Sequence, residues 1–189
     1  MQKDIDSVDY TLDSKIVYQD KLPLSIASAT SSDFLSPGEE KKNLNLLRAF
    51  WLFHETRADD LKESPELQSH IERIELKLDM QSEMLSLLLQ QTVKLPTPVD
   101  FSLSAEHLTA IHDTLYSQGS LVRAELYLLP EYPKPLTFLA RVVGEDSIGS
   151  AYAGKFEICE LDILAREMLE KILFRHHRRQ IAQLRHSKT

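Results

Sequence analysis

Cysteine and glycine are both scarce in this sequence. Cys159 is the only cysteine among 189 residues, so neither an intramolecular disulfide nor a cysteine cluster for zinc can form. With only five glycines, the sequence has no glycine-rich phosphate-binding loop, and it contains no recognisable catalytic triad or pair of catalytic acids. We therefore expect a protein that is not an enzyme and that uses no metal and no cofactor.

An excess of positive charge and long apolar runs are missing as well. The net charge of −7 argues against a protein dedicated to nucleic acids or to anionic membranes. The longest apolar clusters, residues 49–53 and 85–89, are far too short to span a membrane. Acids also stand near the N-terminus where a signal peptide would have its apolar core. We expect no nucleic-acid partner, no membrane span and a cytoplasmic location.

The sequence does contain a long heptad pattern between Ser64 and Thr92. Ser64 can cap a helix and Pro65 suits the first helical position, and neither glycine nor proline follows before Thr92. Such a helix would be about 42 Å long. Its seam, spaced by alternating steps of three and four, consists of Leu67, Ile71, Ile74, Leu78, Gln81, Leu85 and Leu88.

The residues of the seam bear on how many helices would associate. Leu78 and Leu85 at a positions, with Ile74 at a d position, shift the preference from two strands toward trimers or tetramers. Gln81 and the mixed occupancy weaken this preference, and a homotetramer is the state that we favour. The alternative is a long helix that lies along its own domain and buries the seam in an ordinary core.

A shorter helix is expected before the heptad helix. Residues 36–39 form a capping box, and the helix would run to about Lys62 with an apolar face of Leu46, Leu47, Phe50 and Phe53. We predict that both helices form an antiparallel hairpin over residues 36–92, the oligomerisation region. Residues 1–35 would be an N-terminal arm with a strand near residues 15–20, where Pro23 permits only an edge strand or a bend.

The character of the chain changes after Thr92. Short segments rich in β-branched and aromatic residues predict strands near residues 99–104, 107–113, 120–129, 135–143 and 151–158, which suggest a small antiparallel barrel. Helical periodicity returns from Glu160 to about Ser187. On the third of these strands Arg123 and Glu125 share a face, and Arg141 on the next strand could join them in an ion pair.

The last helix carries a basic run at residues 175–179. Cations near the end of a helix interact favourably with its terminal carbonyls, which is the simpler interpretation. The other interpretation is a docking patch for an acidic partner or a phosphate backbone. The adjacent His176 and His177 point about 100° apart on a helix, and His107 and His112 would lie on opposite faces of a strand. We interpret these histidines as surface residues and not as metal ligands.

The order of these segments resembles the PilZ domain family. The resemblance is carried by residues 102–145 and 154–181, and the heptad helix is similar to the extra helical region of an atypical, tetrameric branch of that family. It implies an α+β fold with a small six-stranded PilZ-like antiparallel β-barrel and a C-terminal helix at residues 93–189. This domain would be preceded by the helical hairpin that contains the long heptad-repeat helix.

Typical PilZ domains bind cyclic di-GMP, and the resemblance implies two motifs to check. The first is an RxxxR pair before the opening strand, whose planar, bidentate guanidinium groups grip guanine edges and phosphates. This sequence has no arginine between Arg73 and Arg123, and Lys94 is a lone point charge.

The second motif, (D/N)xSxxG, falls on residues 102–107. Ser104 matches, whereas Ser102 stands in place of Asp or Asn and His107 in place of Gly. In a register shifted by two, Asp100 and Ser102 match and Ala105 stands at the glycine position. Glu106 would add negative charge beside an anionic dinucleotide, so the site should be weak. We interpret both serines as hydroxyls on the exposed face of a strand.

These observations predict a non-enzymatic bacterial signalling or adaptor protein that oligomerises through its heptad helix and binds an unknown protein partner. Cyclic di-GMP is not expected to bind through the usual motifs. The resemblance implies a context of cyclic di-GMP signalling, type IV pilus function, motility or virulence. The alternative is a functional cyclic di-GMP receptor that recruits other arginines, such as Arg123, Arg141 or the basic run of the last helix.

Overall fold

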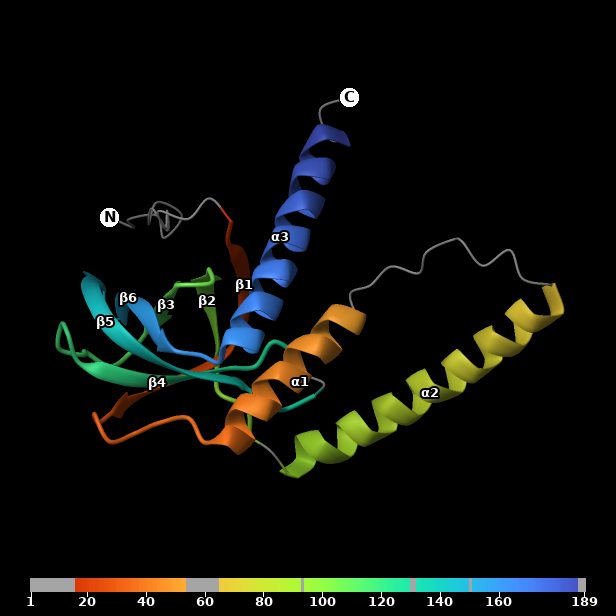
Figure 1. Cartoon of the computed structure of the whole chain (residues 1–189), viewed down its shortest axis with the longest axis horizontal. Coiled ribbons are helices and arrows are strands. Elements are labelled where there is room, and N and C mark those ends of the chain that lie inside the picture. The colour runs from red at the N-terminus through yellow and green to blue at the C-terminus, as the bar shows by residue number, and fades with distance from the viewer. Residues whose placement is uncertain (1–15, 54–64, 93, 130–131, 150, 187–189) are drawn as a thin grey trace.

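A computed structural model describes residues 16–53, 65–92, 94–129, 132–149 and 151–186. Six antiparallel strands close into a barrel in the order β1-β2-β3-β6-β5-β4, which confirms the predicted α+β fold (Figure 1). The strands are β1 Tyr18–Ala29, β2 Pro98–Leu103, β3 His107–His112, β4 Leu121–Leu126, β5 Leu136–Ile148 and β6 Ala151–Glu160. The helices are α1 Pro37–Phe53, α2 Pro65–Thr92 and α3 Ile163–His186.

Strand β1 closes the barrel by pairing with two different strands. Its first half pairs with β2 through Pro23, and its second half pairs with β4 from Leu24 onward. Pro23 has no N–H to donate, and it stands where the strand changes partner. Residues 18–29 thus belong to the barrel, which differs from the predicted boundary of an N-terminal arm at residue 35.

The barrel interior is filled by side chains that alternate with more exposed ones along strands such as β3 and β4. In β4 the buried Val122, Ala124 and Leu126 alternate with the partly exposed Arg123 and Glu125. This period of two directs every second residue inward. The largest fully buried side chains of the strands are Phe138, Phe156, Leu103, Leu108, Leu126, Leu136, Leu139, Val122 and Val142.

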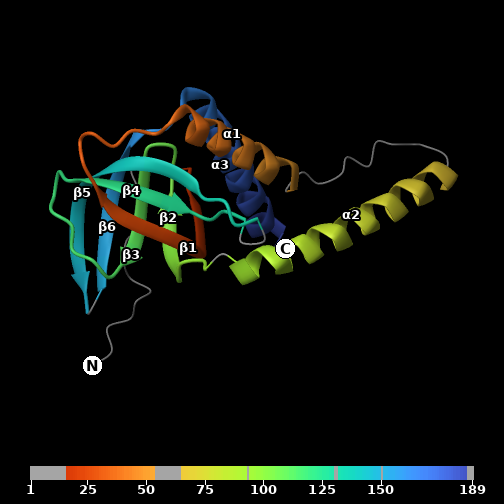
Figure 2. The same cartoon turned by 90° about the horizontal axis from the view of Figure 1, so that it is seen from below.

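Helices α1 and α3 lie side by side against the barrel, α1 against β5 and α3 against β1 (Figures 1 and 2). Three residues of the predicted apolar face of α1, Leu46, Leu47 and Phe50, are buried in the core that the helices share with the barrel, and the side chain of Phe53 lies outside the described residues. The predicted capping box is present too: Ser36 Oγ and Ser36 N each donate to the Glu39 carboxylate, at 2.7 and 2.8 Å. The proposed cap of the next helix, Ser64, lies outside the described residues.

Helix α2 leaves the body of the molecule as a long projecting arm (Figures 1 and 2). The predicted packed hairpin is not what the described residues show, because the helix that packs on α1 is α3. The physical reason is that α1 has one apolar face, and α3 and the barrel already cover it. In the part of the chain that the structure describes, no helix is long and apolar enough to cross a membrane.

Candidate functional site

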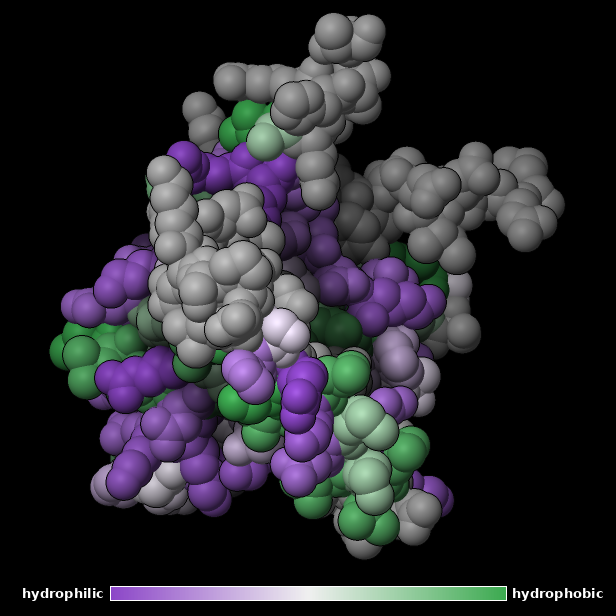
Figure 3. All heavy atoms as spheres, turned by 90° about the vertical axis from the view of Figure 1, so that its right-hand side faces the viewer, coloured by the Kyte–Doolittle hydropathy of each residue, from purple (hydrophilic) through white to green (hydrophobic). Residues whose placement is uncertain are grey.

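The predicted seam on α2 is exposed to solvent. Ile74, Leu78 and Leu85 are 58%, 55% and 61% exposed, and Leu88 and Gln81 are exposed as well. Ile71 is half-buried, and the side chain of Leu67 lies outside the described residues. Figure 3 views the molecule from the α2 side and shows hydrophobic residues gathered along this helix, toward the lower right. The chain's own barrel and helices leave the seam uncovered.

The exposed apolar surface of α2 is wider than one seam. Leu76, Met80, Met84 and Leu87 are each more than half exposed; Met84 flanks the seam at a g position, whereas Leu76 (f) and Met80 and Leu87 (c) lie on other faces of the helix. Large contiguous apolar patches on a protein surface mark interaction sites. A stripe this wide needs more than one neighbouring helix to cover it. The alternative of a helix lying along its own domain is therefore wrong.

Ser104, the serine that matches the motif in its first register, lies in the turn between β2 and β3. Ser104 Oγ accepts hydrogen bonds from Glu106 N at 3.2 Å and His107 N at 2.9 Å. Ser104 N also donates to His107 O at 2.8 Å. A serine hydroxyl that satisfies two backbone donors of a turn is a local structural element. Ser104 thus caps the turn with the atom that the motif would offer to a ligand.

The backbone of the same turn is tied to distant parts of the chain. Arg166 of α3 donates from its guanidinium to Ala105 O. Ile158 N of β6 donates to Glu106 O at 2.7 Å. These bonds hold the turn against α3 and β6.

Both motif serines are buried, so the interpretation as exposed strand hydroxyls is wrong. Ser102 and Ser104 are each 1% exposed. Ser102 faces away from the inward-pointing Phe101 and Leu103, yet neighbouring parts of the fold cover it. Its hydroxyl has no hydrogen-bond partner among the described residues.

The surface beside β1 and β2 is unfavourable for a doubly anionic ligand. An open hollow of about 380 Å³ there is lined by Asp20, Lys21 and Asp100. Asp100, the motif match of the shifted register, lies 3.9 Å from Lys21 Nζ across the two strands. Two carboxylates and one lysine give this hollow a net negative charge. Its lining residues include no arginine, so the bidentate guanidinium donors of an RxxxR pair are missing there.

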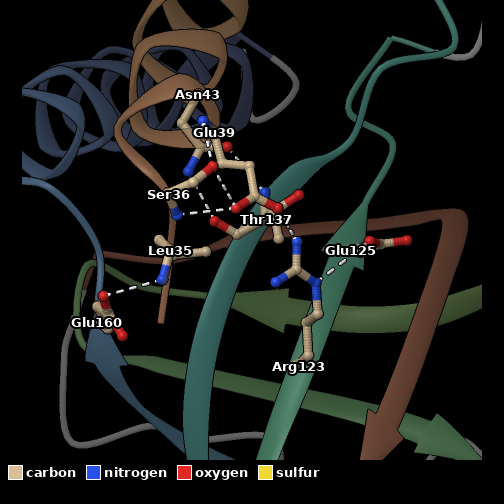
Figure 4. A network of polar contacts seen from close by, with 8 residues as sticks. All are labelled: Leu35, Ser36, Glu39, Asn43, Arg123, Glu125, Thr137 and Glu160. Atoms are coloured by element: carbon tan, nitrogen blue, oxygen red, sulfur yellow. Dashed lines mark hydrogen bonds and ion pairs between the residues drawn. The ribbon is translucent and has the colours of Figure 1, made fainter. Parts of the chain in front are cut away.

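Arg123 contacts two carboxylates, Glu39 at the start of α1 and Glu125 on its own strand β4 (Figure 4). It donates to Glu39 of the capping box and, at 3.5 Å, to Glu125 two residues along β4. The predicted neighbour Arg141 takes no part in this cluster, because it stands opposite Leu121 on β4. Hydrogen bonds from Ser36 and then from Arg123 lower the pKa of Glu39 to about 2. The cluster joins the first turn of α1 to the barrel wall.

A buried amide makes the second link between α1 and the barrel (Figure 4). Asn43 Nδ2 donates to Thr137 O at 2.7 Å, and Thr137 N donates to Asn43 Oδ1 at 2.9 Å. Asn43 is 1% exposed. Its amide donates to and accepts from the backbone of Thr137, as the backbone of a neighbouring strand would. Leu35 N adds a bond of 3.1 Å to the Glu160 carboxylate at the end of β6.

His112 and His176 depart from the interpretation as surface residues, and the ring of His176 lies 4.6 Å from that of Tyr18. The His112 side chain is 9% exposed, and its Nε2 lies 3.4 Å from Glu145 Oε1. Its ring packs against Tyr116 and Phe156, and Gly154 leaves room for it because a Cβ there would overlap the imidazole. In the described part of the chain no group of histidines, cysteines and acids is arranged to hold a metal ion.

Comparison with known protein families identifies the family of this chain. The profile of a family described as "Atypical PilZ domain, cyclic di-GMP receptor" matches residues 47–186, most of the chain. The chain belongs to this family. No curated protein sequence matches it.

A solved structure resembles this atypical PilZ domain over nearly its whole length. It is described as a pathogenic protein from Xanthomonas campestris and as a tetrameric PilZ domain that self-assembles via a helical bundle. The TM-score is 0.72 with 23% sequence identity, and the match covers 90% of this chain and 93% of the other. At that identity the likeness establishes a shared fold.

The sequence indicated some of these site residues and missed others. The seam was visible from its spacing and Ser104 from its place in the motif, whereas Asn43 and the Glu39–Arg123 contact were not predicted. Asn43 lies 94 residues from Thr137, and nothing in either local sequence indicates that they meet. The one available signal for Asn43 is a polar residue three positions before the apolar Leu46 on the same helical face.

Proposed function

We propose that this atypical PilZ domain is a non-enzymatic adaptor that assembles through α2 and displays several barrels on one helical bundle. The observation that carries the proposal is the exposed seam of α2, whose Ile74, Leu78 and Leu85 are more than half exposed in the single chain. Burying such side chains against other copies would release about 1.5–3 kcal/mol for each fully covered residue. Because most helical stability in proteins comes from packing of an amphipathic face, a projecting arm of this kind would gain stability from a partner.

A homotetramer is the assembly that we propose. Leucine at a and isoleucine at d favour more than two strands, and the wide stripe needs several neighbours. The structural relative from Xanthomonas is described as a tetramer formed via a helical bundle, which supports the same mode for this chain. Other copies of this chain are therefore the partners that α2 would bind. A different protein would then bind the assembled tetramer.

We also propose that cyclic di-GMP does not bind through the usual motifs. The support is local: Ser104 is committed to its turn, and Arg166 and Ile158 hold the turn's carbonyls. Asp20 and Asp100 supply charge of the wrong sign nearby. This protein would then take part in cyclic di-GMP signalling through a partner protein and not by binding the nucleotide itself.

The alternative is a cyclic di-GMP receptor that uses other arginines, and a titration with cyclic di-GMP distinguishes it from our proposal. Arg123 is already paired with Glu39 and Glu125, which leaves Arg141 and the basic run of α3 as cations for a nucleotide. Calorimetric titration with cyclic di-GMP should give no binding heat at protein concentrations of tens of micromolar. Saturable binding would contradict the proposal and favour the receptor.

The assembly itself is tested by substitutions in the seam. Analytical ultracentrifugation should give a tetramer for the natural protein and a monomer for the variant Leu78→Asp with Leu85→Asp. A buried aspartate without a partner is strongly unfavourable, and two per chain exceed what a bundle of this size can tolerate. The barrel should keep its thermal unfolding transition, because neither leucine belongs to its core.

A matched control separates the seam from general surface effects. Leu76 is 62% exposed and occupies an f position, away from the proposed interface. Leu76→Asp should therefore leave the assembly intact. A natural protein that sediments as a monomer, or equal dissociation by Leu76→Asp, would contradict assembly through the seam. The link to type IV pilus function, motility or virulence stays a prediction from the family resemblance.

A further inference from the structure

A groove runs between α1 and α3, beside Tyr18 at the start of β1. One part is a hollow of about 160 Å³ with an apolar floor of Tyr18, Phe50, Trp51 and Ile172. A wider, shallower part of about 510 Å³ continues along α3. Trp51, Arg175 and Arg179 line both parts, so the two hollows form one elongated feature, which we call the α1–α3 groove.

The floor of the groove is aromatic and its rim is basic. Arg175 lies over the Trp51 ring, 4.5 Å from its centroid, and Arg178 lies over the Phe174 ring at 5.9 Å. Phe174 is 52% exposed, so an apolar surface continues beyond the deeper hollow. Stacking fixes the guanidinium groups in place while it leaves their N–H edges available for an anion.

The walls carry no negative charge of their own. Residues 171–182 of α3 and residues 41–53 of α1 contain no aspartate or glutamate. In the part of the chain that the structure describes, Lys171, Arg175 and Arg178 have no carboxylate partner. On a chain with a net charge of −7, this is a local concentration of positive charge.

The C-terminal dipole of α3 does not account for these cations. The helix runs to His186, so Arg175 and Arg178 lie more than one turn before its end. The favourable interaction of cations with terminal carbonyls falls off within the last turn. The simpler interpretation of the basic run therefore fails for these residues, and the docking interpretation gains support.

We propose that the α1–α3 groove binds an acidic peptide segment of a partner protein, with one apolar side chain of the segment anchored against Trp51. Arginine forks match carboxylates in bidentate geometry, and the elongated shape between two helices suits a peptide chain. The apolar floor favours an amphipathic peptide over a nucleic acid strand. The deeper hollow has room for one aliphatic or aromatic side chain.

The groove contains its own spectroscopic probe, because Trp51 is the only tryptophan of the chain. The full-length protein is titrated with an unlabelled synthetic peptide that carries a phenylalanine and a leucine flanked by glutamates. Anchoring should shift the Trp51 emission to shorter wavelength and saturate. The variant Arg175→Gln with Arg178→Gln should bind about tenfold more weakly, since two charge-assisted contacts are lost.

The matched control is Lys41→Gln with Lys42→Gln, which removes the same charge from exposed positions at the start of α1. This variant should bind within about twofold of the natural protein, because exposed charges that far away are largely screened. A loss equal to that of the arginine variant would overturn the proposal, as would equal binding of a peptide with glutamine in place of glutamate. Tighter binding of single-stranded RNA or of phosphatidylglycerol vesicles would overturn the assignment to a peptide.

Discussion

At the scale of single residues, buried polar side chains in this fold satisfy backbone groups, both within a turn and between distant segments. Ser104 satisfies two backbone donors of the β2–β3 turn, and Asn43 satisfies both backbone groups of Thr137. Buried polar groups cost free energy unless they are paired, so each of these residues is required where it stands. The motif match at Ser104 is thereby explained by the architecture of the turn.

The contribution of Asn43 can be measured directly. Asn43→Ala should lower the free energy of unfolding by about 2–4 kcal/mol, because Thr137 N and O would lose their side-chain partners in a buried setting. Asn43→Asp should also destabilise the fold, since a carboxylate cannot donate to Thr137 O. Urea denaturation followed by fluorescence gives both values. Asn45→Ala, at an exposed position of the same helix, is the control and should cost less than about 0.5 kcal/mol.

At the scale of elements, the first turn of α1 is where helix and barrel meet. The capping box satisfies the N-terminal donors of the helix, and its Glu39 also reaches Arg123 on β4. One carboxylate therefore stabilises both the start of the helix and its position on the barrel.

The low pKa of Glu39 predicts how stability changes in acid. Its folded-state pKa of about 2 lies below the ordinary value of 4.5, so this stabilisation is complete above about pH 5 and is lost as pH falls toward 2. Urea denaturation at a series of pH values should show part of the acid loss disappear in Glu39→Gln. Glu40→Gln, in the same turn, should retain the natural profile; an equal effect of both variants would assign the loss to general charge.

The helices and strands also differ in how much of their position and packing could be predicted from the sequence. The strands of residues 98–160 were recognisable because alternation and turn residues bound each of them. Strand β1 was harder to predict, because its apolar and polar residues do not alternate regularly and it contains Pro23. Its partner strands also lie about 75 to 102 residues away in the sequence. The partner of α1 was missed for a similar reason: an apolar face shows that a helix packs but not against which element.

At the scale of the whole molecule, α2 stands apart from the single core that unites the barrel, α1 and α3. Most helical stability in proteins comes from packing of an amphipathic face, so the helicity of α2 should increase on assembly. In a tetramer, several barrels and several α1–α3 grooves would be held together. Such an arrangement raises the effective concentration for a multivalent partner.

The dependence on assembly gives a prediction for the intact protein. Because dilution shifts an assembly toward its subunits, the melting temperature measured by far-ultraviolet circular dichroism should rise with protein concentration. The variant Leu78→Asp with Leu85→Asp should show no such dependence and should have a weaker helical signal. A melting temperature of the natural protein that is independent of concentration would mean that α2 needs no second copy.

The sequence by itself determined the period of each segment: a seven-residue repeat for α2, alternation for the strands, and a capped amphipathic helix for α1. These patterns are local consequences of backbone geometry, so they can be read without the fold. Only the tertiary structure decided that β1 completes the barrel, that α3 rather than α2 covers α1, and that Ser104 is committed to a turn. Those outcomes depend on which distant surfaces meet, and local sequence carries no information about the partner of an apolar face or of a polar atom.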